Sequence, residues 1–174
     1  HAQYETHKYE DAMISVNNAI SLNPDDWTYK KLRGQIATEL QQHSTAIESF
    51  KELAGLTKQK SSFYWLGSAY MESGDYENAI TTFAEIDALP ASPQYSTTYA
   101  DYLGLKGDAH THLKQYKEAL ECYRKYTEIA PKSSNAWRKR GILAKSHGVA
   151  GEAEECNSEL SKLVHNRKKP VLHK

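Results

Sequence analysis

Hydrophobic residues in the middle of the chain recur at the spacing of a helix. Phe63, Leu66 and Tyr70 follow one another at intervals of three and four residues, which places them on one face of an α-helix. The polar run Ser73-Gly74-Asp75 then interrupts the pattern. A second helical stripe follows, made of Tyr76, Ala79, Ile80 and Phe83. The pattern predicts two short helices joined by a tight turn.

This pattern of small and large residues returns at a fixed offset along the chain. Four glycines are each followed twelve residues later by an alanine: Gly34 and Ala46, Gly67 and Ala79, Gly107 and Ala119, and Gly141 and Ala153. Four residues beyond these alanines stand Phe50, Phe83, Tyr123 and Asn157. A half unit precedes them, with Tyr9, Ala12, Val16, Ala19 and Pro24. The five alanines are 34, 33, 40 and 34 residues apart, which predicts a stacked array of like units.

The small residues have a physical role in such an array. Glycine and alanine are expected where two helix axes approach closely, and the aromatic residues are expected to fill the space around them.

The repeated unit resembles the tetratricopeptide repeat family. One unit matches that pattern with Phe63, Leu66, Gly67, Tyr70, Ala79 and Phe83; the next matches with Gly107, Tyr116, Ala119, Tyr123 and Pro131; and the last full unit matches with Trp137, Gly141 and Ala153. The resemblance covers roughly residues 3 to 163. The departures are Arg33, Lys106 and Arg140 in place of the usual leucine, and Asn157 in place of an aromatic residue.

The resemblance implies an all-α fold, a right-handed α-solenoid of stacked antiparallel helix pairs. We expect a single domain over residues 1–174, with about four full repeats and an N-terminal half repeat. The half repeat covers 1–25, and the full repeats cover 26–59, 60–93, 100–133 and 134–166. Because the chain starts without methionine and inside a repeat, we expect it to be a fragment of a longer protein.

The expected helices follow from the stripes and their breaks. They cover residues 8–22, 26–40, 44–56, 60–73, 76–88, 97–113, 116–130, 134–147 and 150–165, and residues 1–7 are expected to be the end of a truncated earlier helix. Residues 89–98, with two prolines within four residues, form an irregular loop. That loop is either a tolerated surface insertion or a contact for a partner. The basic tail 165–174 is expected to be a solvated helix end, with a localisation signal or a phosphate contact as the alternative.

The composition argues against several classes of protein. The 22 basic and 22 acidic residues balance, which argues against a nucleic-acid binder or a binder of anionic membranes. No apolar run is long enough to cross a membrane, and no secretory signal is visible. Cys122 and Cys156 occupy equivalent positions in adjacent repeats, too far apart for a disulfide, so both are expected to be reduced thiols. We therefore expect a cytoplasmic protein.

The sequence shows no catalytic or metal-binding constellation, so we expect neither an enzyme nor a cofactor. His110 and His112 are two residues apart on a predicted helix and point in different directions. The eight histidines are therefore expected at the surface. Glu152, Glu154 and Glu155 begin a helix, where carboxylates are favoured by the helix dipole.

The resemblance places a binding surface on the concave groove, which the first helix of each repeat lines. The partner-binding residues that it implies are Lys31, Gln35, Tyr64, Trp65, Ser68, Met71, Asp101, Asp108, His112, Arg138, Lys139 and Lys145. Tyr64 and Trp65 would be rigid apolar anchors, although Trp65 could instead pack against a neighbouring helix. The aspartates would make the middle of the groove acidic, and the cations would make its C-terminal end basic. The alternative is that these charges belong to an ordinary solvent-exposed face.

One subtype of the family is not expected here. Co-chaperones of this family clamp a C-terminal carboxylate of heat-shock chaperones with lysines, asparagines and an arginine. The matching positions hold Gln35, Trp65, Asp101 and Leu105 after Lys31, or Tyr64, Ser68, Leu105, Asn135 and Lys139 when the match starts one repeat later. Neither set forms a clamp, and Asp101 would repel a carboxylate.

Three functions remain open from the sequence. The leading hypothesis is a protein-interaction module, a scaffold or adaptor that binds a protein or peptide partner in its groove. The second is an architectural segment that self-associates through its open N-terminal half repeat. The third is a chaperone for a secreted or membrane-inserted client.

Overall fold

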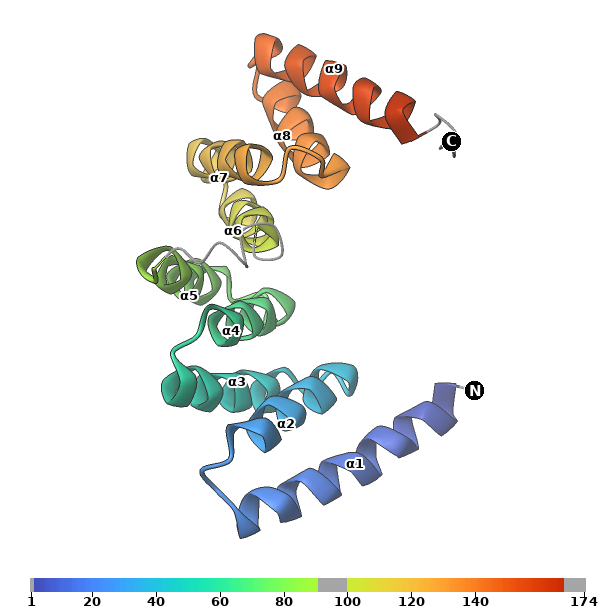
Figure 1. The fold of residues 1–174 in the computed structure, drawn as a ribbon, viewed down its shortest axis with the longest axis vertical. Coiled ribbons are helices and arrows are strands. Elements are labelled where there is room, and N and C mark those ends of the chain that lie inside the picture. Colours follow the sequence, from blue (N-terminus) through green and yellow to red (C-terminus); the bar gives the residue numbers. More distant parts are fainter. Residues whose placement is uncertain (1, 91–99, 168–174) are drawn as a thin grey trace, which may run out of the picture. The chain divides into compact units, whose positions relative to one another are not determined.

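The computed structural model describes the backbone of residues 2–90 and 100–167, and the side chains of 7–90 and 100–165. Within these ranges the secondary structure consists of helices without strands, so the all-α prediction is confirmed (Figure 1). The helices are α1 (Ala2–Leu22), α2 (Trp27–Glu39), α3 (His43–Thr57), α4 (Lys60–Ser73), α5 (Tyr76–Ala88), α6 (Asp101–His112), α7 (Tyr116–Ile129), α8 (Ser134–Ser146) and α9 (Ala150–Arg167).

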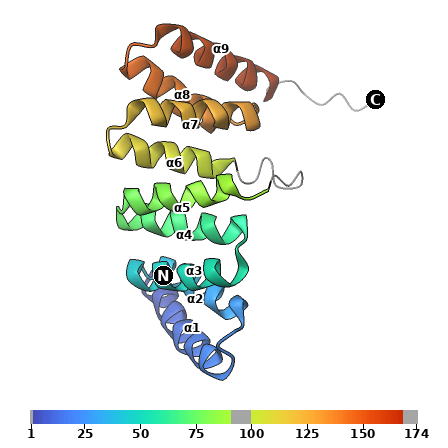
Figure 2. The same ribbon diagram turned by 90° about the vertical axis from the view of Figure 1, so that its left-hand side faces the viewer.

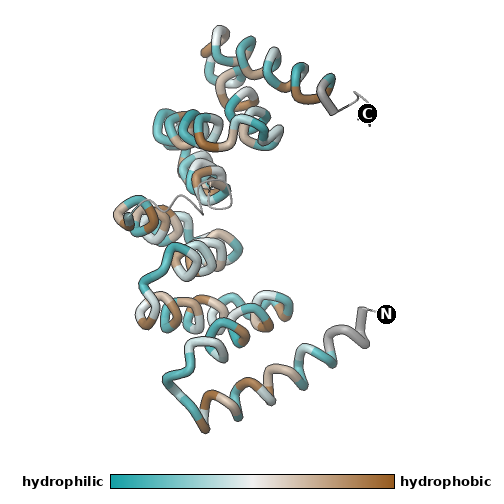
Figure 3. Tube along the Cα trace, viewed as in Figure 1, coloured by the Kyte–Doolittle hydropathy of each residue, from teal (hydrophilic) through white to brown (hydrophobic). Residues whose placement is uncertain are grey.

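The chain divides into two compact units, His1–Ala91 and Ser92–Lys174. Unit 1 contains α1 to α5 and unit 2 contains α6 to α9. Within each unit, helices that follow one another in the sequence pack side by side (Figures 1 and 2). Each helix carries hydrophilic and hydrophobic residues together, so burial depends on which face meets a neighbour (Figure 3).

Most predicted helix boundaries lie within a few residues of the observed ones, because the predicted turn residues do end the helices. Gly74 ends α4 with a left-handed φ of 80°, and the Asp75 side chain accepts a hydrogen bond from the Asn78 amide at the start of α5. Asp26 caps α2, and Ser133 caps α8 through the Ala136 amide.

The first helix differs from the prediction. Residues 2–22 form one continuous helix, whereas we expected the end of a separate helix over 1–7. No glycine or proline interrupts this stretch, so helical hydrogen bonding continues without a break. The predicted start of a helix at residue 97 and most of the predicted loop 89–98 lie outside the described residues, as does most of the basic tail.

The repeat glycines lie where the sequence predicts close helix contacts. A Cβ atom at Gly34 would stand 2.7 Å from Cζ of Phe50, and one at Gly67 would stand 2.7 Å from Cζ of Phe83. In unit 2 the ring of Tyr123 occupies the corresponding place over Gly107. Only hydrogen on these Cα atoms leaves room for the aromatic ring of the second helix.

The last repeat uses a different partner. Its glycine, Gly141, faces Cβ of Cys156 and not the exposed Asn157. Cys156 and Cys122 are both buried free thiols, and burial raises the pKa of the Cys156 thiol.

Candidate partner-binding faces

In unit 1, three of the predicted groove residues meet at one pocket. It lies between α2 and α4, has a volume of about 150 Å³ and is called the α2–α4 pocket below. Its lining consists of Gln35, Thr38, Glu39, Phe50, Trp65, Ser68, Ala69 and Glu72. The structure therefore brings Gln35, Trp65 and Ser68 together, while Lys31, Tyr64 and Met71 do not line this pocket.

Trp65 serves both the core and the pocket. Its ring stacks on Phe50 with centroids 5.8 Å apart and an interplanar angle of 20°. Phe50 itself is buried against Gly34 and forms part of the hydrophobic cluster of α2, α3 and α4. Tyr64 approaches Trp65 edge-on, with centroids 6.1 Å apart. The indole is thus held in place while one side of it lines the pocket.

Ser68 is the polar side chain at the wall of the α2–α4 pocket. Its Oγ is buried and makes no hydrogen bond within the part of the chain that the structure describes. Thr38, on the opposite wall, donates its hydroxyl to the Gly34 carbonyl at 3.1 Å. A buried hydroxyl without a partner is costly, and a ligand that bonds to it removes that cost.

An ion-pair network that sequence reasoning missed braces α2 against α3. Lys30 pairs with Glu52, and Arg33 Nη2 lies 3.2 Å from the same carboxylate. Arg33 Nε also donates to Ser49 Oγ at 2.7 Å. Burial raises the pKa of Glu52, but the hydrogen bonds and charges of Lys30 and Arg33 outweigh burial and leave the pKa of Glu52 below its ordinary value. Arg33, which departs from the family pattern, therefore stabilises the repeat.

In unit 2, the predicted acidic residues are engaged within the fold. Asp108 accepts a hydrogen bond from Tyr123 Oη at 2.7 Å and pairs with Lys139 of α8. Asp101 accepts a hydrogen bond from Tyr126, whose ring packs over Gly104. Burial, together with the neighbouring Asp108 carboxylate, raises the pKa of Tyr123 far above its ordinary value, so the phenol remains a donor. Asp108 and Lys139 largely neutralise each other.

The remaining predicted groove residues of unit 2 are exposed. Arg138 donates to Asn135 Oδ1 at 3.0 Å, and Lys145 and His112 lie near the end of their helices. Ile142, between Arg138 and Lys145 on α8, is 65% exposed. Arg138, Ile142 and Lys145 form an exposed stripe on α8, and neither these residues nor His112 of α6 line the pockets described here.

The packing of glycine against an aromatic ring in successive helix pairs agrees with a comparison of the sequence with protein-family models. Residues 61–90 and 100–133 match the tetratricopeptide repeat model. These two segments are tetratricopeptide repeats. Repeats of this family are in general scaffolds for protein–protein interaction and not enzymes. The comparison with curated proteins gave no match.

Solved structures share the repeat fold at low sequence identity. The crystal structure of MamA has a TM-score of 0.82 and 21% identity, and the alignment covers 97% of this chain and 95% of that chain. PilW, described as a widely conserved type IV pilus biogenesis factor, has a TM-score of 0.72 and 17% identity over 93% and 73% of the two chains. YrrB, described as a repeat protein with an unusual peptide-binding site, has a TM-score of 0.70 and 16% identity over 95% and 87%.

A second network in unit 2 joins α7, α8 and α9. Glu152 at the start of α9 accepts hydrogen bonds from Arg124 of α7 and Arg140 of α8. Arg140 Nη2 also donates to Glu155 at 2.9 Å. The hydrogen bond from Arg124, and next that from Arg140, hold the pKa of Glu152 below its ordinary value against the opposing effect of burial. From the sequence, this glutamate was expected only to interact favourably with the helix dipole.

The prediction that all histidines lie at the surface of the repeats is wrong for His110. This side chain is only 9% exposed, and its Nδ1 lies 2.7 Å from Gln115 Oε1. It is buried because its face of α6 packs toward α7.

Among the residues that the structure describes, no group of three or more metal-ligating side chains comes together. No described helix is long and apolar enough to cross a membrane.

Proposed function

We propose that the chain is a protein-interaction module whose α2 and α4 face binds an extended segment of a partner protein. The observation that carries this proposal is the α2–α4 pocket, which joins three residues that the repeat pattern assigns to ligand binding. Its volume of about 150 Å³ is below the roughly 300–1,000 Å³ of small-molecule sites and suits a single side chain of a peptide.

The chemistry of the pocket indicates what that side chain is. Trp65 and Phe50 supply an aromatic base for an apolar group. Glu39 and Glu72 are exposed carboxylates at the rim, so residues next to the apolar group are expected to be basic. Gln35 and Ser68 supply hydrogen-bonding groups for the backbone of the segment.

In unit 2 we propose that the exposed stripe of α8 is a further contact surface. Arg138, Ile142 and Lys145 combine one apolar side chain with two cations. Because Asp108 is paired with Lys139, the charge that this stripe offers to a partner is positive. A partner that contacts this stripe is expected to carry carboxylates.

Filling the α2–α4 pocket is expected to abolish capture of the partner. Ser68→Phe places a ring into the pocket without removing the Trp65 packing, so binding is expected to fall by about tenfold or more. The measurement is affinity capture from native lysate with wild type and variant side by side, with circular dichroism to check the fold. Ser44→Phe, which adds the same ring at an exposed position of α3, is the matched control.

The two variants separate pocket binding from other effects of an added ring. A partner that is lost with Ser68→Phe and retained with Ser44→Phe supports the pocket and identifies the partner by mass spectrometry. Equal retention by both variants contradicts the assignment of the pocket.

A second candidate function is self-association in a larger assembly. Exposed apolar side chains on the first two helices favour it: Ile14 is 62% exposed, Leu22 is 88% exposed and Trp27 is 48% exposed. The likeness to a pilus biogenesis factor is consistent with a role in building an assembly or with the chaperone alternative. Light scattering over a range of concentrations tests self-association, and a strict monomer at high concentration contradicts it.

A further inference from the structure

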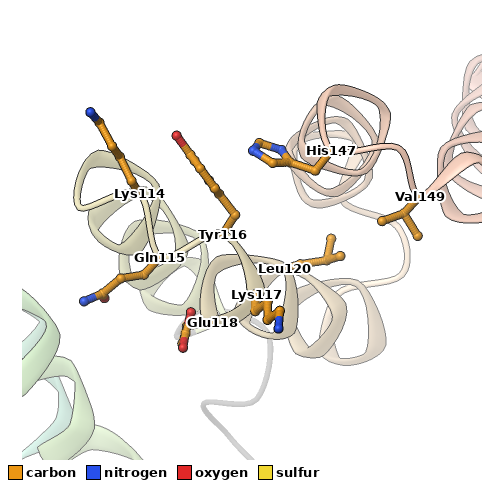
Figure 4. A pocket seen from close by; sticks show the side chains of 8 residues that line it. All are labelled: Lys114, Gln115, Tyr116, Lys117, Glu118, Leu120, His147 and Val149. Carbon is orange, nitrogen blue, oxygen red and sulfur yellow. The ribbon is translucent and has the colours of Figure 1, made fainter.

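A larger pocket lies at one edge of unit 2. The turn between α6 and α7 and the turn between α8 and α9 form it, and its volume is about 510 Å³. Tyr116, Leu120, His147 and Val149 provide most of its apolar lining, with Lys114 and Lys117 beside them (Figure 4). We call it the Tyr116–His147 pocket. It has more than three times the volume of the α2–α4 pocket, so it has room for a large apolar side chain together with part of the segment that carries it.

The hydrophobic core holds part of the wall of this pocket, and local contacts hold His147. The Tyr116 and His147 rings are in contact, with centroids 3.9 Å apart and an interplanar angle of 38°. His147 Nδ1 lies 3.1 Å from the Leu143 carbonyl oxygen, to which it can donate, and this contact fixes the imidazole. Tyr116 and Val149 also pack against the hydrophobic cluster that includes Leu120. A pocket whose walls are ordered before binding loses little conformational entropy when it is filled.

The charges at the rim favour an anionic ligand. Lys114 and Lys117 are exposed, and neither has an ion-pair partner among the residues that the structure describes. Glu118 is the one carboxylate in the lining, so lysines outnumber it by two to one. Gln115, the residue before α7, bonds to His110 and leaves the start of α7 without a side-chain cap. The positive end of the helix dipole thus adds to the charge of the two lysines.

We propose that the Tyr116–His147 pocket is a second docking site, which binds an acidic segment of a partner protein by one apolar side chain. The apolar side chain enters between Tyr116, Leu120 and Val149, and the carboxylates beside it in the segment face Lys114 and Lys117. The site lies in a different unit from the α2–α4 pocket, whose rim carries Glu39 and Glu72. The two pockets therefore select segments of opposite charge, and this inference does not depend on the first pocket.

The experiment uses blocked nine-residue peptides with a central leucine, flanked on both sides by glutamates, by lysines or by serines. Fluorescence anisotropy with the full chain measures the dissociation constant of each peptide at low ionic strength. In Ser68→Phe, whose α2–α4 pocket is filled and no longer takes the lysine-flanked peptide, the glutamate-flanked peptide is expected to bind about tenfold more tightly than the lysine-flanked peptide. Replacing the central leucine by serine in the glutamate-flanked peptide is expected to abolish binding, because the apolar contact is then lost.

The decisive variant is Lys114→Glu with Lys117→Glu, which reverses both rim charges. It is expected to weaken binding of the glutamate-flanked peptide by about tenfold or more, because attraction becomes repulsion. Both lysines are exposed, and acidic residues are favoured near the start of α7, so the fold is expected to persist. Lys125→Glu with Lys132→Glu changes two other exposed lysines of unit 2 by the same net charge and is the matched control.

Three results would overturn the proposal. The first is that Ser68→Phe shows no preference for glutamate-flanked peptides. The second is that both double variants weaken binding equally, and the third is that the serine-centred peptide binds as well as the leucine-centred one. Equal binding of phosphatidylserine vesicles and peptide would indicate a general attraction of anions and would also overturn it. Ser68→Phe is expected to leave glutamate-flanked binding unchanged, so failure of the α2–α4 assignment can be told apart from failure of this one.

Discussion

Replacing Gly67 by alanine is expected to destabilise unit 1 by about 2 kcal/mol. The added Cβ would stand within 2.8 Å of three ring atoms, Cε1, Cζ and Cδ1, of Phe83. That ring is fully buried, so it cannot turn away into solvent, and the two helices must separate instead. The usual gain of alanine over glycine in a helix is smaller than this cost.

The measurement is urea denaturation of the whole chain followed by circular dichroism, and Gly55→Ala is the matched control. Gly55 lies in α3, and nothing stands within 4 Å of the position of its Cβ. Alanine there is expected to stabilise the protein by about 0.5 kcal/mol through helix propensity alone. If both variants shift the unfolding midpoint in the same direction, the close contact between glycine and aromatic ring is not what holds the repeat together.

Replacing Glu152 by glutamine is expected to destabilise unit 2 by about 2 kcal/mol at neutral pH. The carboxylate is 16% exposed and accepts hydrogen bonds from two arginines on two other helices. Glutamine keeps the shape but loses the charge, so Arg140 retains only Glu155 as a carboxylate partner. Charge-assisted bonds of this kind are stronger than those of exposed surface pairs.

The matched control is Glu154→Gln, at an exposed position in the same turn of α9. It is expected to change the free energy of unfolding by less than about 0.5 kcal/mol. Similar losses for Glu152→Gln and Glu154→Gln would mean that helix-dipole effects, and not the network, account for the result.

The pH dependence provides a second test of the Glu152 network. The pKa of Glu152 is lower in the folded state than in the unfolded state, so the folded state binds fewer protons at this site. Its contribution is therefore complete above the unfolded value of about 4.3 and is lost as the pH falls through the lower folded pKa. The unfolding free energies of wild type and Glu152→Gln are expected to differ by a constant amount from about pH 5.5 upward and to converge in acid. A difference that persists unchanged in acid would contradict the charge-based explanation.

Local patterns in the sequence were sufficient to predict most helices. The breaks at Gly74 and at Pro24 were read correctly, because capping and turn residues act within a few positions of the chain. The error at the N-terminus came from applying the repeat register to residues 2–22, a stretch that contains no helix-breaking residue.

Residue partners were harder to predict than helices. The pair of Asp108 and Lys139 joins residues 31 positions apart, and Arg124 and Glu152 are 28 positions apart. The repeat pattern assigned Asp108 and Lys139 to a groove face but could not show that they neutralise each other. Arg33 and Arg140 were visible in the sequence as departures from the family pattern. A charged residue in place of the usual leucine could have indicated that each has an ion-pair partner within the fold.

The two candidate pockets differ in how far the sequence predicted them. Gln35, Trp65 and Ser68 could be placed on one surface from their offsets to the repeat glycines, and the structure brings them to one pocket. The Tyr116–His147 pocket had no sequence signal, because it arises where two turns from different repeats meet. His110 likewise looked like a surface histidine until α7 covered it.

By itself, the sequence determined that this protein is a helical repeat, where its helix pairs turn, and that small residues stand where helices approach closely. These features depend on neighbours three to sixteen residues away, and the repeat period carries that information. Only the tertiary structure decided which charges remain available to a partner and where the pockets lie. Both depend on side chains of different repeats that meet when the helices pack, and their distance in space does not follow from their spacing in the sequence.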